Sequence, residues 1–168
     1  MIYRRLGPED ASRYRSLRIS GLRESPSAFV SSAEEDEALL PEVTQERLRH
    51  APDVATFGAF KDDELVGICT IKREKRIRLA HKANLLGVYV APAARGIGAG
   101  RELIRLALTF AASMEVRQVN LGVNAANAPA LRLYESLGFV AFGTEKQFMC
   151  IDGVFQDEIH MVCFLAIS

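Results

Sequence analysis

The chain of 168 residues has no net charge, because its 21 lysines and arginines balance its 21 aspartates and glutamates. A balanced charge does not favour a nucleic-acid-binding protein, since such proteins need a basic surface to hold phosphates. No apolar run approaches the roughly 20 residues that cross a bilayer. The residues after Met1 also lack the apolar stretch of a signal peptide. We therefore expect a cytoplasmic protein with neither a nucleic-acid nor a membrane partner.

Cysteine and histidine are scarce, at three residues each. The cysteines are odd in number and far apart, and each lies in an apolar, strand-like segment, so we expect buried free thiols rather than disulfides. The histidines share no metal-ligand spacing with one another or with the cysteines, and no metal site is expected. The three cysteines are Cys69, Cys150 and Cys163.

Seven segments have the composition of β-strands, being rich in apolar and β-branched residues and bounded by turn residues. Asp62-Asp63 and Asp152-Gly153 form the tight turns of two antiparallel hairpins. We expect the hairpin strand that ends the chain to pair between subunits over Ile159–Ile167 and to form a homodimer. The predicted strands span residues 1–6, 54–61, 64–72, 85–90, 118–123, 139–150 and 154–165.

Four segments have helical spacing of their apolar residues. Asp10 and Asn127 stand where N-cap residues are favoured, and Gly138 ends the last helix. The alternation of strands and helices in the second half predicts an α/β fold with a sheet of mixed direction. No linker-like composition interrupts the chain, so residues 1–168 are expected to form a single domain. The predicted helices span 10–22, 41–50, 98–114 and 127–137.

The most informative segment joins the fourth predicted strand to the third predicted helix. Glycines that open a helix allow several backbone N–H groups to point at one spot, at the positive end of the helix dipole. Side chains there would block a phosphate, and flanking arginines can add charge-assisted hydrogen bonds. This segment therefore predicts a pyrophosphate site. It reads Val88-Tyr89-Val90-Ala91-Pro92-Ala93-Ala94-Arg95-Gly96-Ile97-Gly98-Ala99-Gly100-Arg101.

Two commoner phosphate loops do not match this segment. A P-loop needs a lysine directly after its last glycine, and Gly100 is followed by Arg101. A dinucleotide fingerprint that starts at Gly96 or Gly98 lacks its third glycine. A loop that merely links strand to helix is the other alternative, and three alternate glycines preceded by Arg95 argue against it.

Two motifs together resemble the GCN5-related N-acetyltransferase (GNAT) superfamily. The first is Gln/Arg-x-x-Gly-x-Gly/Ala, filled here by Arg95, Gly98 and Gly100. The second, about thirty residues downstream, is Asn-x-x-Ala-x-x-Leu-Tyr-x-x-x-Gly-Phe. Its positions are all filled, and the resemblance covers nearly the whole chain. The residues that fill it are Asn127, Ala130, Leu133, Tyr134, Gly138 and Phe139.

The resemblance implies a GNAT fold, with a mixed central sheet of six to seven strands, about four helices and splayed central strands. It implies acetyl-CoA as co-substrate, with the pantetheine arm lying between the splayed strands and the pyrophosphate on the glycine loop. Asn127 is expected to contact the cofactor from the start of its helix. The cofactor-binding residues so implied are Val88, Tyr89, Val90, Arg95, Gly96, Ile97, Gly98, Ala99, Gly100, Arg101 and Asn127.

The resemblance also gives Tyr134 a catalytic role, with its hydroxyl directed at the thioester sulfur. A tyrosine, with a pKa of about 10, keeps its proton at neutral pH and can protonate the leaving thiolate as a general acid. The alternative is a core aromatic that shares its helix face with Leu133 and Leu137. The general base stays open. The glutamate usual on the preceding strand is absent, which leaves a water chain or one of Glu24, Glu34 and Glu35.

The predicted activity is transfer of acetyl to a primary amine of a small molecule, by direct attack rather than through Cys150. Acetylation of a protein N-terminus or lysine is the related alternative. A non-catalytic acyl-CoA sensor is the alternative from another class. The acceptor wall is expected from residues 20–40 and 146–156.

Overall fold

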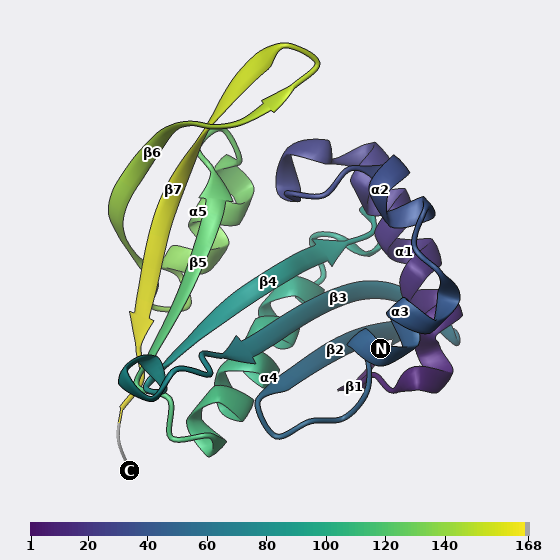
Figure 1. Cartoon of the computed structure of the whole chain (residues 1–168), viewed down its shortest axis with the longest axis horizontal. Coiled ribbons are helices and arrows are strands. Elements are labelled where there is room, and N and C mark those ends of the chain that lie inside the picture. The colour runs from purple at the N-terminus through teal and green to yellow at the C-terminus, as the bar shows by residue number, and fades with distance from the viewer. Residues whose placement is uncertain (167–168) are drawn as a thin grey trace.

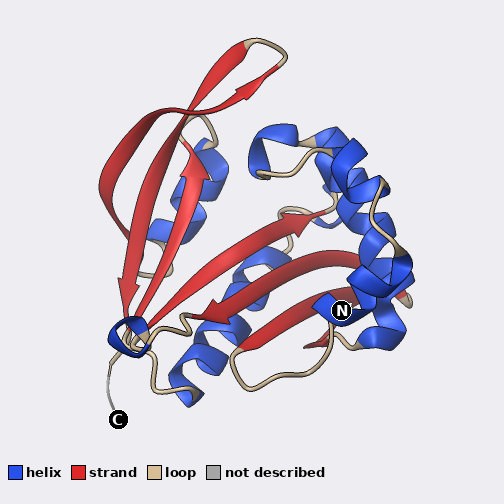
Figure 2. Ribbon diagram, viewed as in Figure 1, coloured by secondary structure: helices blue, strands red, loops and turns tan. Residues whose placement is uncertain are grey.

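The computed structural model describes residues 1–166 and contains one seven-stranded sheet with helices on both faces (Figures 1 and 2). The spatial order of the strands is β1-β2-β3-β4-β5-β7-β6. The strands are β1 (Ile2–Arg5), β2 (Val54–Lys61), β3 (Glu64–Arg73), β4 (Lys82–Val90), β5 (Gln118–Asn124), β6 (Val140–Ile151) and β7 (Val154–Phe164). The helices are α1 (Ala11–Glu24), α2 (Ala33–Glu37), α3 (Pro41–Arg47), α4 (Ala99–Ser113) and α5 (Ala128–Glu135).

The sheet is antiparallel except between β4 and β5, which run parallel and pair only over Lys82–Asn84 and Gln118–Asn120. Beyond these residues the two strands diverge, as Figure 1 shows. β4 also carries a bulge, because Gly87 and Val88 together face the single residue Cys69 of β3. A bulge bends its strand and increases the local twist. The expected splay of the central strands is thus confirmed, and the bulge accompanies it.

Two apolar cores flank the sheet. One lies between the sheet and α4 with α5, and in it Leu103 and Ile104 are fully buried. The other lies on the opposite face, under the N-terminal helices, and contains Leu17 and Phe29. β3 supplies both cores, since Ile68 belongs to the second and Ile71 to the first. The sheet is therefore covered on both faces by helices, and its central strands are held rigidly on each side of the splay.

The segment before α3 contains a short helix, α2, that was not predicted from the sequence. In α2, Ser32 accepts a hydrogen bond from the Glu35 N–H (3.2 Å), and the Glu35 carboxylate accepts one from the Ser32 N–H (2.7 Å). This reciprocal capping box satisfies two N–H groups at the helix start. Asp36, on the same helix, is buried rather than solvated. The acidic residues of α2 therefore do not form a uniformly exposed surface.

Asp10 is the N-cap residue of α1 as expected, but its side chain makes no capping hydrogen bond to that helix. Its carboxylate instead accepts hydrogen bonds from both Arg4 Nη atoms (2.7 Å each) and from the Gly7 N–H (3.0 Å). The pairing with Arg4 holds the pKa of Asp10 below its usual range. The carboxylate thus ties β1 to the turn before α1.

Two further expectations need correction. Cys69 and Cys163 are buried free thiols, but Cys150 is exposed, because the outer half of the β6–β7 hairpin extends beyond the sheet (Figure 1). β7 is also not an edge strand, since it lies between β5 and β6, and the sheet edges are β1 and β6. Ile167, the last residue of the segment expected to pair between subunits, lies outside the described residues.

Within residues 1–166 no helix is long and apolar enough to cross a membrane. The same described part of the chain contains no cluster of three or more side chains that could hold a metal ion.

Candidate active site

A cavity of about 1440 Å³ opens where β4 and β5 diverge. Its walls come from α1, the turn at Pro26–Ala28, β4, the glycine loop, β5, α5 and the β6–β7 hairpin. Ile97 does not line it and is exposed to solvent. Every other residue predicted to bind the cofactor, and the predicted general acid, lies on this one cavity. These residues are Val88, Tyr89, Val90, Arg95, Gly96, Gly98, Ala99, Gly100, Arg101, Asn127 and Tyr134.

The glycine loop presents unused donors to this cavity. The backbone N–H groups of residues 96–101 find no acceptor among the described residues, and α4 begins in the middle of this run, at Ala99. Gly96 and Gly98 have φ values of +76° and +87°, which favour glycine, and no atom lies within 4 Å of where their Cβ atoms would stand. Six adjacent free donors at a helix N-terminus, with open space before them, fit a diphosphate.

Glycine at position 100 allows close packing and is not needed for an unusual backbone conformation. A Cβ at this position would lie 3.3 Å from Leu133 Cδ2 of α5 and 3.7 Å from Val90 Cγ2 of β4. The missing side chain therefore allows the first turn of α4 to approach both elements closely. The loop is held against the splay between β4 and β5 by this contact.

The two arginines of the loop differ in what they contact. Arg95 donates to both Glu24 carboxylate oxygens (3.1 and 2.7 Å) and to the Val90 carbonyl (2.9 Å). Arg101 donates to Ser136 Oγ (2.8 Å) through one Nη atom only. A guanidinium has five N–H donors, so Arg101 keeps free donors beside the loop. Arg95 is instead engaged with α1, and its contribution to the loop is chiefly its backbone.

Tyr89 lines the cavity, and its buried side chain contacts two other residues that line it. The ring lies 5.9 Å from that of Phe29, and the hydroxyl donates to Glu24 Oε2 (3.3 Å). Burial raises the pKa of Tyr89. The strand edge that faces the gap, beyond Asn84 on β4 and beyond Asn120 on β5, carries backbone groups without a strand partner across it. Such an edge can bond an extended amide chain such as pantetheine.

Tyr134 projects from α5 into the first core and reaches the cavity with its hydroxyl. The residue is 7% exposed, and its ring packs edge-on against Phe139 at 5.7 Å. The hydroxyl makes no hydrogen bond with any described residue, yet it is not sealed from the cavity. Burial, with a smaller effect of the Cys69 thiol, raises the pKa of Tyr134. The phenol is thus protonated at neutral pH and free to donate.

Asn127 caps α5 as predicted, because its Oδ1 accepts a hydrogen bond from the Ala130 N–H (3.2 Å). Its Nδ2 has no partner among the described residues, and Asn127 lines the cavity. The capping oxygen and the amide nitrogen are separate atoms, so the cap leaves a donor for a ligand.

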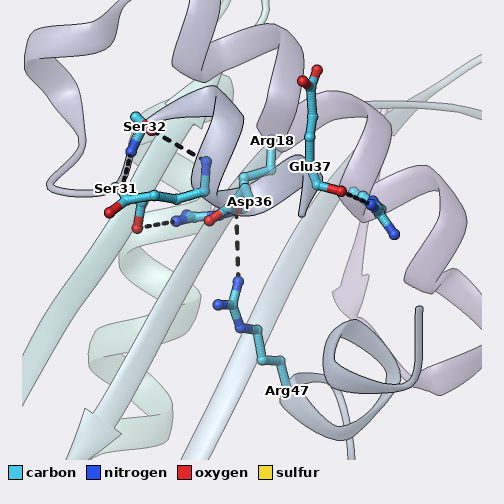
Figure 3. Close-up of polar contacts among 8 residues, drawn as sticks. Arg18, Ser31, Ser32, Asp36, Glu37 and Arg47 are labelled. Carbon is cyan, nitrogen blue, oxygen red and sulfur yellow. Dashed lines mark hydrogen bonds and ion pairs between the residues drawn. The ribbon is translucent and has the colours of Figure 1, made fainter. Parts of the chain in front are cut away.

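One wall of the cavity is positively charged. Arg18 of α1 and Arg47 of α3 both line it, and both contact the buried Asp36, Arg18 through Nε and Arg47 at 3.7 Å (Figure 3). Arg18 also donates to Ser31 Oγ (3.4 Å). Its Nη1 is 3.6 Å from where a Cβ on Gly87 would stand, which places it over the β4 bulge. Two guanidinium groups against one carboxylate leave one positive charge in excess.

The opposite wall holds a carboxylate that the sequence analysis missed. Glu158 of β7 lines the cavity, and its side chain is 12% exposed. His160, two residues further on the same face of β7, lies 3.8 Å from Glu158 Oε1 through Nδ1 and 3.0 Å from Glu145 Oε2 through Nε2. The alternate spacing of Glu158 and His160 on a strand was the available signal, but it is common on exposed strands.

The glutamates considered as general base are poorly placed for that role. Glu34 and Glu35 do not line the cavity. Glu24 does, but its pairing with Arg95 lowers the pKa of its carboxyl to about 2. A carboxylate that binds its proton so weakly is a poor acceptor near neutral pH.

Comparison with known proteins agrees with this geometry. The model of the acetyltransferase (GNAT) family matches residues 19–139. A mycothiol acetyltransferase of Acidothermus cellulolyticus is 49% identical over an alignment of 103 residues, and the match covers 55% of this chain and 32% of that protein. The chain therefore spans about a third of the length of that relative. The L-amino acid N-acetyltransferase AaaT of Escherichia coli K12 is 30% identical over 118 residues, 70% of this chain and 72% of that protein.

Among solved structures, yncA of Salmonella typhimurium superposes with a TM-score of 0.82 at 17% identity. The match covers 100% of this chain and 95% of that one. That structure contains its cofactor acetyl-CoA. The free donors of the glycine loop, the splayed strands and the matched family model lead to one assignment. The chain belongs to the acetyltransferase (GNAT) family, whose enzymes are N-acetyltransferases that use acetyl-CoA as acetyl donor.

Proposed function

We propose that the protein transfers acetyl from acetyl-CoA to the primary amine of a small molecule, with Tyr134 as general acid. The observation that carries this proposal is the meeting of two features on one cavity: the unused N–H donors of residues 96–101 and the unbonded hydroxyl of Tyr134. The first suits a diphosphate, and the second suits a leaving group that must be protonated.

Acetyl-CoA supplies an activated acetyl thioester when it is bound. The glycine loop holds the diphosphate through its backbone, and the unpaired edges of β4 and β5 hold the pantetheine amides. A backbone N–H at Tyr89 or Val90 donates to the oxyanion that develops on the carbonyl. Tyr134 donates its proton to the departing thiolate sulfur and regains a proton from solvent.

The acceptor we propose carries an acidic group beside its amine. The excess positive charge of Arg18 and Arg47 lies on the acceptor side of the β4 bulge, where it can pair with a carboxylate. The 30% identity to an L-amino acid N-acetyltransferase supports the same class. Direct attack by the amine is preferred over a ping-pong route, because Cys150 is exposed and does not line the cavity.

The test is the release of CoA from acetyl-CoA, followed with a thiol reagent over a panel of amines. We expect release with amino acids, and weaker release with the matched amines that lack the carboxylate. Faster release with peptides or lysine-bearing proteins than with amino acids would favour protein acetylation instead. Calorimetric binding of acetyl-CoA without release on any amine would favour a sensor.

A further inference from the structure

Glu158 is a largely buried carboxylate without a bonded partner. It makes no hydrogen bond with any described residue, and the nearest nitrogen of a basic side chain is His160 Nδ1 at 3.8 Å, beyond hydrogen-bond distance. A buried carboxylate in this state loses hydration without receiving bonds in return. The Glu158 side chain instead lines the cavity, which it faces from β7.

The neighbouring strand makes room for this carboxylate. A Cβ on Gly122 of β5 would lie 1.9 Å from Glu158 Oε1, so the carboxylate lies directly over the Gly122 backbone. Gly122 has no positive φ, and its lack of a side chain therefore serves space rather than backbone conformation. Gly122 itself lines the cavity, beyond the point where β5 leaves β4. The carboxylate thus lies on the C-terminal side of the splay, across from β4.

The titratable side chains that face Glu158 come from its own strand, β7, and from the neighbouring strand β6. Glu145 is its cross-strand partner on β6, His160 lies on β7, and Asn124, opposite on β5, is uncharged. Burial raises the pKa of Glu158, His160 lowers it and Glu145 raises it. His160 contacts both glutamates, and Glu145 is exposed, so the three side chains connect the cavity with solvent.

We propose that Glu158 receives the ammonium group of the acceptor and removes its proton before attack on the thioester. This inference rests on the proposed function and names the general base that the sequence left open. The ammonium N–H bond breaks, its electron pair stays on nitrogen as the nucleophile, and the proton passes to a Glu158 oxygen. The carboxylic acid then returns this proton to solvent beside His160. After attack the nitrogen loses its second proton to solvent as the amide forms, and the thiolate takes up one proton through Tyr134, so one proton is released per turnover.

The first test is the pH profile of Glu158→Gln, an isosteric change without a basic oxygen. We expect kcat/KM at pH 7 to fall roughly 10²- to 10⁴-fold, the usual range for a general base. The parent should show a plateau, because proton removal by Glu158 compensates for the scarcity of free amine. The variant should instead gain about tenfold per pH unit up to the pKa of the amine, since only free amine reacts. An unchanged rate and plateau in the variant would overturn the proposal.

The second test separates function from structure without any substrate. A pKa raised by burial means that ionisation of Glu158 opposes folding above its folded pKa, and the penalty disappears as pH falls toward the ordinary value of about 4.3. Glu158→Gln should therefore raise the melting temperature at pH 8, and the gain should shrink at pH 5. A lower melting temperature at pH 8 would mean that the carboxylate is bonded structurally, and would also overturn the proposal.

Gly122→Ala is the matched variant that keeps the carboxylate but moves it. Its backbone conformation suits alanine, so we expect a folded protein with lower kcat. Parent-like kcat in this variant would contradict the proposed position of the base. If the parent itself binds acetyl-CoA but releases no CoA on any amine, the proposed function fails first, and that result is distinct from failure of Glu158 alone.

Discussion

Tyr134 combines two properties that a general acid needs and a core residue does not. Its ring is packed, while its hydroxyl is left without a protein partner on the cavity. Removing this hydroxyl breaks no hydrogen bond to a described residue. Tyr134→Phe should therefore keep its stability and acetyl-CoA affinity and lose roughly 10²-fold or more in kcat. Steady-state kinetics and calorimetry check this, with Tyr3→Phe, remote from the cavity, as control. Parent-like kcat would remove Tyr134 from the mechanism.

Arg18 is the residue that should distinguish acidic from neutral acceptors. Lysine keeps the charge but loses the planar fork that can hold Asp36 and a ligand carboxylate together. Arg18→Lys should raise KM for amino acids roughly tenfold, equal to about 1.4 kcal/mol, and change KM for the corresponding decarboxylated amines little. The comparison of the two substrate series is the measurement. Equal changes in both series would show that Arg18 does not bind the acid group.

The element that controls cofactor binding is the loop from Arg95 to Arg101. In Gly98→Asp, a φ of +87° costs roughly 1 to 2 kcal/mol for a residue with a side chain, and a carboxylate enters the diphosphate site. We expect at least a tenfold loss of acetyl-CoA affinity by calorimetry. Gly143→Asp is the control, because Gly143 is exposed on β6, has open space and has no positive φ. Parent-like affinity in Gly98→Asp would contradict the assigned diphosphate site.

At the level of elements, the features that the sequence predicts are those determined by residues close together in the chain. The loop, the Asn127 cap and the Tyr134 position follow from residues close together in the chain, and the structure brings them to one cavity. The charged walls depend on packing between distant segments. Glu158 faces the cavity because β7 lies next to Gly122, and Asp36 is buried because α1 and α3 both reach it. These contacts join segments that are far apart in the chain, so residue spacing in the sequence does not predict them.

At the scale of the molecule, the homodimer stays a prediction, with its location changed. β7 is paired with β5 on one side and with β6 on the other, so strand pairing between subunits would need an edge strand, β1 or β6. Exposed apolar side chains on β6, Val140 and Phe142, favour that edge. Light scattering should give twice the mass of the chain, about 37 kDa against 18.5 kDa for one chain. A single monomeric mass would contradict the prediction.

The short pairing between β4 and β5 has a thermodynamic consequence. Three residue pairs join β1–β4 to β5–β7 across the sheet, so a molecule lodged in the divergence would bridge the two halves. Binding to the native state alone adds RT ln(1 + [L]/Kd), about 2.7 kcal/mol at a hundredfold excess over Kd. Protection of β5 amides against deuterium exchange should then rise with the concentration of the acetyl donor. The cofactor would be a structural crosslink of the sheet as well as a reactant.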